Sequence, residues 1–150
     1  MDYLIEQGIK VDAIITDPPY AVTSYSWDQI IPFDQMWDKL SKLIKDDGAI
    51  VLFGNEPFSS SLRMSNPKFY RYDWKWIKTQ VTGFQNAKYQ PLRCYEDIMI
   101  FSKCGAVASA KPPMRYFPQG IIPVNLKVTT KPINYLGDKK SDEKVSYTQE

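Results

Sequence analysis

Four consecutive residues, Asp17-Pro18-Pro19-Tyr20, combine groups that could bind a flat ring bearing an amine. The Asp17 carboxylate can accept hydrogen bonds from an amino group, and the Tyr20 ring offers a face on which a base can stack. Pro18 and Pro19 fix φ and keep the chain out of a helix, so the backbone is stiff. The same residue types also occur in ordinary turns, where Asp caps a backbone amide.

The position of this tetrapeptide favours a ligand site over a plain turn. It directly follows a short apolar run, Val11 to Ile15, that predicts a buried strand. Open α/β sheets bind their ligands at the carboxyl ends of strands. We therefore expect the tetrapeptide to lie at the ligand-binding edge of a sheet.

The elements expected next have the order of a βαβ unit. Pro32 and Asp34 signal a helix start, apolar residues then recur at helical spacing, and Asp47-Gly48 ends the helix. The continuous apolar segment Ala49 to Phe53 is typical of a strand buried on both faces. Because strand, helix and strand follow one another, we expect the two strands to be parallel.

A second part of the sheet is predicted further along the chain. A helix opened by Gly54-Asn55-Glu56-Pro57 is expected to run to about Met64, and alternation between aromatic and other residues predicts a strand over 72–77. Residues 79–93 have the composition of a basic loop. Asp97 to Phe101 is then a strand antiparallel to its neighbour, because only a loop joins the two.

Length and composition limit the classes of protein that fit. A chain of 150 residues with 14% aromatic residues can form one globular domain with a core. It contains no histidine and only two cysteines, Cys94 and Cys104, which excludes a Cys/His zinc site and a histidine base. Two thiols fit a reduced, cytoplasmic protein, and no apolar run approaches the roughly 20 residues that span a bilayer.

The net charge of +2 conceals two segments of opposite charge. Residues 1–60 hold 4 Lys/Arg and 10 Asp/Glu, whereas residues 61–135 hold 12 and 3. A basic block beside an acidic one is expected where one face of a protein meets a polyanion, although cationic side chains can also simply solvate a surface. Among the aromatic residues of the basic block we expect four cations to bind DNA: Lys75, Lys78, Lys88 and Arg93.

In combination these segments resemble the catalytic half of the amino-methylating DNA methyltransferases, above all the N6-adenine enzymes of bacteria and their phages, including those of restriction–modification systems. The resemblance runs from about Val11 to Lys103. A weaker likeness to the start of the family's target-recognition region lies at Tyr116-Phe117-Pro118-Gln119-Gly120. The main likeness is carried by Asp17-Pro18-Pro19-Tyr20, Trp27-Asp28, Ile31-Pro32-Phe33, the segment 48–54, Asn86-Ala87-Lys88, Gln90-Pro91-Leu92-Arg93 and Glu96.

The resemblance implies a fold and a reaction. The fold is α/β, a partial Rossmann-like methyltransferase sheet with a parallel βαβ core plus antiparallel strands. The partner is double-stranded DNA, from which the target base is flipped at a cost of a few kcal/mol. A methyl group passes directly from S-adenosylmethionine to the exocyclic nitrogen, with no metal and no covalent intermediate.

The resemblance also assigns roles to residues. Asp17 and the Pro18 carbonyl accept the amino hydrogens, the stiff Pro18-Pro19 backbone holds them in place, and Tyr20 stacks on the ring. Asp17 also supplies the one part of the cofactor site that can be assigned. Tyr25 and Trp27 either help to hold the ring, fill the place that it leaves, or anchor the loop.

Two alternatives remain open at this point. Asp rather than Ser at position 17 favours adenine N6 over cytosine N4 as the methylated nitrogen, and cytosine N4 stays the alternative. The chain could also be a catalytically inactive DNA-binding fragment of such an enzyme, since its basic block needs no chemistry to bind phosphates.

The sequence departs from the family pattern at two places. Ala21 stands where the family usually has glycine, which would strain the turn by about 1 kcal/mol if φ is positive there. The glycine-rich turn that lets the backbone approach the cofactor is absent, because none of the seven glycines lies within a few residues of another. We therefore expect a fragment that is incomplete at the cofactor-binding half, or one complemented by a second polypeptide. Residues 1–104 would form the catalytic half and 105–150 the irregular or partly disordered start of the target-recognition region.

Overall fold

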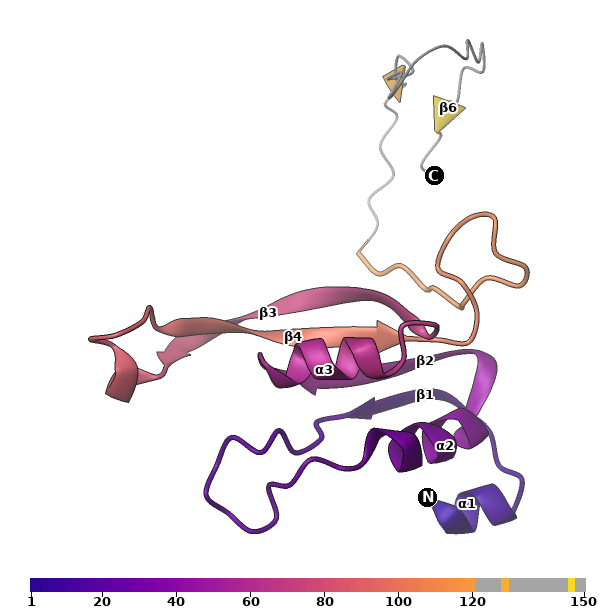
Figure 1. Cartoon of the computed structure of the whole chain (residues 1–150). Coiled ribbons are helices and arrows are strands. Elements are labelled where there is room, and N and C mark those ends of the chain that lie inside the picture. The colour runs from indigo at the N-terminus through magenta and orange to yellow at the C-terminus, as the bar shows by residue number, and fades with distance from the viewer. Residues whose placement is uncertain (121–127, 130–145, 148–150) are drawn as a thin grey trace. The chain divides into compact units, whose positions relative to one another are not determined.

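The computed structural model describes residues 1–120, 128–129 and 146–147 (Figure 1). The chain divides into two compact units, Met1–Arg115 and Tyr116–Glu150. In the second unit, β5 (Val128–Thr129) pairs with the antiparallel strand β6 (Ser146–Tyr147). The rest of the expected target-recognition region beyond residue 120 lies outside the described residues. All predicted site residues lie in the first unit.

The first unit is built on a four-stranded mixed sheet with the order β1-β2-β4-β3 (Figure 1). The two parallel strands are β1 (Val11–Thr16) and β2 (Ile44–Gly54). The third strand in the order, β4 (Arg93–Phe101), is antiparallel both to β2 and to β3 (Tyr70–Thr82). The predicted parallel βαβ core with added antiparallel strands is therefore confirmed.

The core lies between the sheet and two helices, α2 (Phe33–Leu43) and α3 (Phe58–Ser65). A short helix, α1 (Asp2–Glu6), precedes β1 and contacts α2. The apolar residues of α2 and α3 recur at helical spacing, so each helix presents one apolar stripe to the sheet. The buried residues that meet there are Met36, Trp37, Leu40, Phe58, Leu62, Ile50, Leu52, Met99 and Phe101.

The opposite face of the sheet is not covered by any helix of the described residues, which corrects two expectations. No residue of β1 is buried, and Ile15 is 69% exposed, because β1 is an edge strand covered on one face only. In β2, Ile50 and Leu52 are fully buried while Val51 and Phe53 are only half-buried. The prediction of a buried strand over Val11 to Ile15 and the prediction of a strand buried on both faces over Ala49 to Phe53 were therefore both wrong.

Two element boundaries also differ from the prediction. Helix α2 ends at Leu43 rather than at Asp47-Gly48, because Ile44 is buried as the first residue of β2 and pairs with Val11. Residues 79–82 continue β3 instead of forming a loop, since Thr82 pairs with Arg93. A one-turn 3-10 helix, Phe84–Asn86, follows. The hairpin of β3 and β4 thus forms a long arm that projects beyond the helices (Figure 1).

After β4 the first unit continues as an irregular segment. Residues 102–115 contain only one isolated bridge, between Gly105 and Pro113. The segment returns to the sheet at Arg115, whose backbone N–H donates to the Asp47 carbonyl at 3.0 Å. Within the described part of the chain, no helix has both the length and the apolar composition needed to cross a membrane.

Candidate active site

The tetrapeptide lies directly after the carboxyl end of β1, beside the end of the parallel strand β2. Thr16, the last residue of β1, pairs with Leu52, two residues before β2 ends at Gly54. Asp17 is exposed, Pro18 is buried, and Pro19 and Tyr20 are half-buried. The stiff prolines are therefore packed against the body of the unit, while the Asp17 carboxylate is open to a ligand.

Tyr20 connects this carboxylate to the core. Its hydroxyl donates a hydrogen bond to Oδ1 of Asp17, and its ring packs on Phe58 with the centroids 5.0 Å apart. Burial raises the pKa of Tyr20, and the neighbouring charges of Asp17 and Glu96 raise it further. The phenol therefore stays neutral and acts as a donor, which holds Asp17 in one orientation and leaves its second oxygen available.

The loop after the tetrapeptide is organised by Asp28, which the sequence identified only as part of a family motif. Its carboxylate accepts the backbone N–H groups of Ala21, Val22 and Thr23 at 2.9, 2.8 and 2.6 Å and the Thr23 hydroxyl at 2.8 Å. Asp28 is only 5% exposed. Burial opposes its charged form, but the hydrogen bonds from Thr23 and the backbone outweigh it and lower its pKa.

Ala21 adopts φ +55°, the positive value at which the family's glycine would be unstrained. Within the described residues it is the only non-glycine residue with positive φ. The hydrogen bond from its N–H to Asp28 holds the residue in this conformation. The predicted strain at Ala21 is therefore present, and Asp28 offsets it.

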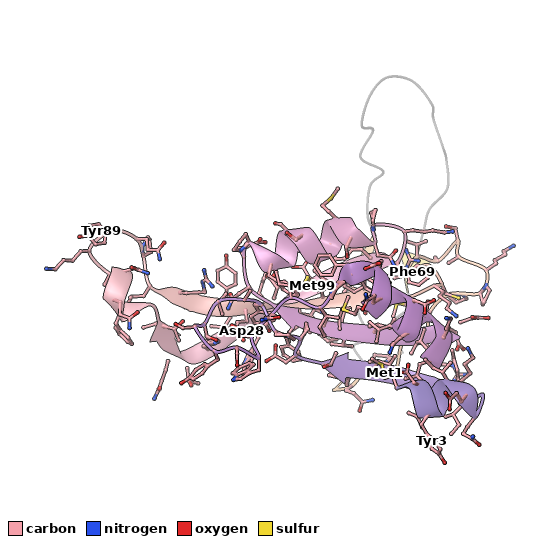
Figure 2. All side chains as sticks on the ribbon, turned by 60° about the horizontal axis from the view of Figure 1, so that its bottom comes forward. Met1, Tyr3, Asp28, Phe69, Tyr89 and Met99 are labelled. Atoms are coloured by element: carbon pink, nitrogen blue, oxygen red, sulfur yellow. The ribbon has the colours of Figure 1, made fainter. Side chains whose placement is uncertain are left out.

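Together the tetrapeptide and the loop enclose a pocket of about 360 Å³, lined by Asp17, Pro18, Pro19, Tyr20, Val22, Thr23, Trp27 and Asp28. Trp27 stacks on Tyr25 at 5.7 Å with an interplanar angle of 12°, and both rings are largely exposed. Figure 2 shows Asp28 in this loop, beyond the end of β1. The pocket thus combines a carboxylate with aromatic and apolar walls, a composition suited to a flat polar ring.

The four predicted DNA-binding cations fall into two pairs. Lys75 contacts Asp73 at 2.7 Å and also bonds to Asp97, whereas Lys78 is ion-paired with Glu96. These two positive charges are therefore balanced within the unit. Lys88 and Arg93 are exposed at the tip of the arm and make no ion pair with any described residue. Their charge is free to meet a phosphate.

Two further carboxylates, Asp97 and Glu96 on β4, lie at the edge of the sheet where β2 ends. The Asp97 side chain is 3% exposed and also contacts Arg63 at 3.1 Å. Burial opposes its ionisation, but hydrogen bonding from Lys75 and the charge of Arg63 lower the pKa of Asp97 on balance. Glu96 accepts from the Asn55 side chain at 3.4 Å, so it joins the end of β2 to β4.

Within the described residues, no strand end opens onto a glycine-lined cofactor site. Of the glycines, Gly54 is the one that ends a parallel strand, but a Cβ there would lie 2.6 Å from Met99 and 2.8 Å from Ser59, so this backbone faces packed side chains. No group of three or more His, Cys, Asp or Glu residues in the described ranges is placed to hold a metal ion. The residues that the structure describes therefore fit an amine-bearing ring, and they do not by themselves complete a site for S-adenosylmethionine.

The likeness of this chain to known proteins lies in its fold. No protein-family model and no curated protein matches the chain. Among solved structures, two of a DNA methyltransferase are similar in fold, in agreement with the predicted methyltransferase-like sheet.

Two of the similar structures are of M1.HpyAVI. Its complex with SAM superposes with a TM-score of 0.50 and 21% identity, over 68% of this chain and 50% of that one. The structure of M1.HpyAVI alone gives a TM-score of 0.51 with the same identity and coverage. The likeness at this identity concerns the fold, and the matched part spans half the length of the M1.HpyAVI chain.

Proposed function

We propose that this chain is the base-binding part of an S-adenosylmethionine-dependent DNA methyltransferase that acts on the N6 amine of adenine. The observation that carries the proposal is the pocket at the carboxyl end of β1, where Tyr20 orients Asp17 beside an ordered aromatic loop. The similarity of the fold to M1.HpyAVI supports the same reading.

The proposed mechanism needs positioning rather than proton transfer. The free oxygen of Asp17 and the carbonyl of Pro18 would accept the two hydrogens of the exocyclic amine, which directs the nitrogen lone pair away from them. Because the Asp28 hydrogen bonds order the loop in advance, little reorganisation is needed when a base enters. The Trp27 side of the pocket would pack against the flipped ring.

S-adenosylmethionine, when bound, would supply an electrophilic methyl group to this amine. Asp17 is the one residue of this chain that we place beside the donor. The remaining contacts to the cofactor would come from a further polypeptide segment, linked to this chain or separate from it. A complementing polypeptide is therefore part of the proposal.

DNA would be held by the uncompensated cations. Lys88 and Arg93 can bind phosphates without breaking an internal contact, and Tyr25 and Trp27 offer rings to an extruded base or to the gap that it leaves. Lys75 and Lys78 could contribute only by leaving Asp97 and Glu96. We therefore assign the first phosphate contacts to the arm.

The test uses a target base without a pairing partner, because the free energy needed to flip such a base out of the duplex is small. The chain is titrated with a duplex carrying adenine opposite an abasic position, and with the same duplex carrying purine, which lacks the 6-amino group. Since hydrogen bonds to a charged group contribute about 1.5–3 kcal/mol, we expect adenine to bind at least 10-fold more tightly.

The Asp17→Ala variant should lose this preference and keep its affinity for the purine duplex, whereas Asp34→Ala, an exposed carboxylate on α2, should change neither. Equal binding of adenine and purine by the wild type would contradict the proposal. A larger preference for cytosine over its amine-free analogue would instead favour cytosine N4.

A further inference from the structure

The tip of the β3–β4 arm has a composition that the proposed base pocket does not explain. Residues 79–95 contain no Asp or Glu, although this stretch includes Lys88 and Arg93. Phe84 and Tyr89 are 69% and 87% exposed. Three side-chain amides accompany them, those of Gln85, Asn86 and Gln90, and none makes a hydrogen bond within the described part of the chain.

The arm tip is nevertheless an ordered structure. Gly83 takes φ +92°, which opens the turn, and the N–H groups of Tyr89 and Gln90 both donate to the Asn86 carbonyl at 2.9 and 3.0 Å. Asn86, Gln90 and Arg93 line a shallow pocket of about 250 Å³ together with Thr82, Gly83 and Pro91. The free amides are therefore presented by a hydrogen-bonded turn rather than by a loose loop.

The arm projects from the same edge of the sheet as the candidate active site. Strand β3 is antiparallel to β4, which is antiparallel to β2, so β3 runs parallel to β1 and ends at the edge where Asp17 lies. Lys75 is level with Asp97 and with Gly54, the last residue of β2, so residues 76–82 of β3 extend beyond the end of β2 and pair with β4 alone. At about 3.3 Å per residue this overhang reaches roughly 20 Å. Figure 2 shows Tyr89 at its far end.

We infer that the arm tip enters a groove of the DNA and reads base edges beside the target base. A two-stranded β-ribbon fits the major groove, and Asn and Gln amides are suited to the N6 and N7 atoms of adenine. Lys88 and Arg93 flank these amides and would hold the adjacent phosphates. A reach of roughly 20 Å corresponds to about six base pairs at 3.4 Å each. The inference rests on the proposed function, since it takes DNA as the partner.

The experiment selects binding sites with the full chain. A pool of duplexes carries one adenine opposite an abasic position, flanked by randomised base pairs, and the bound fraction is sequenced. We expect adenine enrichment within about six base pairs of the fixed adenine, on one side of it. Asn86→Ala/Gln90→Ala should lose this enrichment while its affinity for the unselected pool changes less than about threefold.

Salt dependence separates the phosphate contacts from base reading. Lys88→Ala/Arg93→Ala should reduce the slope of log affinity against log salt by about 2, since each phosphate contact contributes about 0.9. Lys68→Ala/Lys111→Ala removes two exposed cations, neither ion-paired within the described ranges, from the opposite end of β3, and should leave slope and enrichment unchanged. Circular dichroism checks that each variant folds.

The outcomes distinguish the two proposals. The inference that the arm reads base edges is overturned if the wild type shows no adenine enrichment, or if the Asn86→Ala/Gln90→Ala variant keeps it. Either result leaves the proposed function standing. A slope that falls equally in the control variant overturns the phosphate contacts of the arm. If the wild type binds no duplex at all, DNA is not the partner and the proposed function fails as well.

Discussion

The backbone N–H of Ala21 donates a hydrogen bond to Oδ1 of Asp28 at 2.9 Å, and it does so from a residue with φ +55°. One residue carries the strain and the other offsets it. Because Tyr20 precedes Ala21 directly, this bond sets the direction in which the chain leaves the candidate base pocket. The geometry of the pocket therefore depends on a carboxylate seven residues away in sequence.

Replacing Ala21 by glycine should stabilise the unit. Glycine removes about 1 kcal/mol of strain at positive φ, part of which is offset by the larger entropy of the unfolded chain. We expect the free energy of unfolding to rise by up to about 1 kcal/mol in urea titrations. Ala13→Gly in β1 is the matched control and should lower it by about 0.5–1 kcal/mol. Destabilisation by both substitutions would show that Ala21 is unstrained.

Asp28→Asn should loosen the loop of residues 21–28. An amide cannot accept four hydrogen bonds as the carboxylate does, so hydrogen exchange at the amides of Ala21, Val22 and Thr23 should accelerate. The control variant Asp34→Asn should leave this exchange unchanged. Protection that survives in Asp28→Asn would mean that other contacts order the loop.

The hydrogen bonds to Asp28 predict that the order of the loop of residues 21–28 depends on pH. The folded-state pKa of Asp28 is lowered, so its stabilising contribution is complete above the unfolded value of about 3.9 and is lost as the pH falls towards the lowered value. Exchange of the three amides, corrected for its intrinsic pH dependence, should therefore rise below about pH 4 in the wild type. In Asp28→Asn the corrected exchange should no longer change over this range.

Asp97→Ala should be strongly destabilising. Its side chain is 3% exposed and pairs with both Lys75 and Arg63, and the loss of one partner from a buried ion pair costs about 3–5 kcal/mol. Asp38→Ala breaks the exposed pair with Lys42 on α2 and should cost about 0.5 kcal/mol. If urea titrations show the same loss in free energy of unfolding for the two variants, the buried ion pairs of Asp97 stabilise the unit no more than an exposed pair does.

The isolated chain should bind S-adenosylmethionine weakly. In the described part of the chain the only parallel-strand end with a glycine, at Gly54, faces the packed side chains of Met99 and Ser59, and the sequence has no glycine-rich turn. We expect no heat of binding in calorimetry at micromolar concentrations of the cofactor. Micromolar binding by the chain alone would contradict the incomplete cofactor site. Wild type and Asp17→Ala should behave alike in this measurement.

Sequence reasoning predicted the features that depend on local pattern. The βαβ order, the parallel pairing of β1 with β2, the antiparallel hairpin and the helix after Pro57 all follow from periodicity and from the length of the connections. The tetrapeptide could be placed at a strand end for the same reason. The positive φ at Ala21 could also be anticipated, because a family glycine at that position pointed to it.

Only the tertiary structure decided which of these residues are free to act. Lys75 and Lys88 look equivalent in the sequence, yet the first is neutralised by Asp97, 22 residues away, and the second is not paired with any described residue. Strand β1 became an exposed edge for the same physical reason. Charge compensation and burial are set by residues that are distant in sequence and adjacent in space, and a local pattern does not contain them.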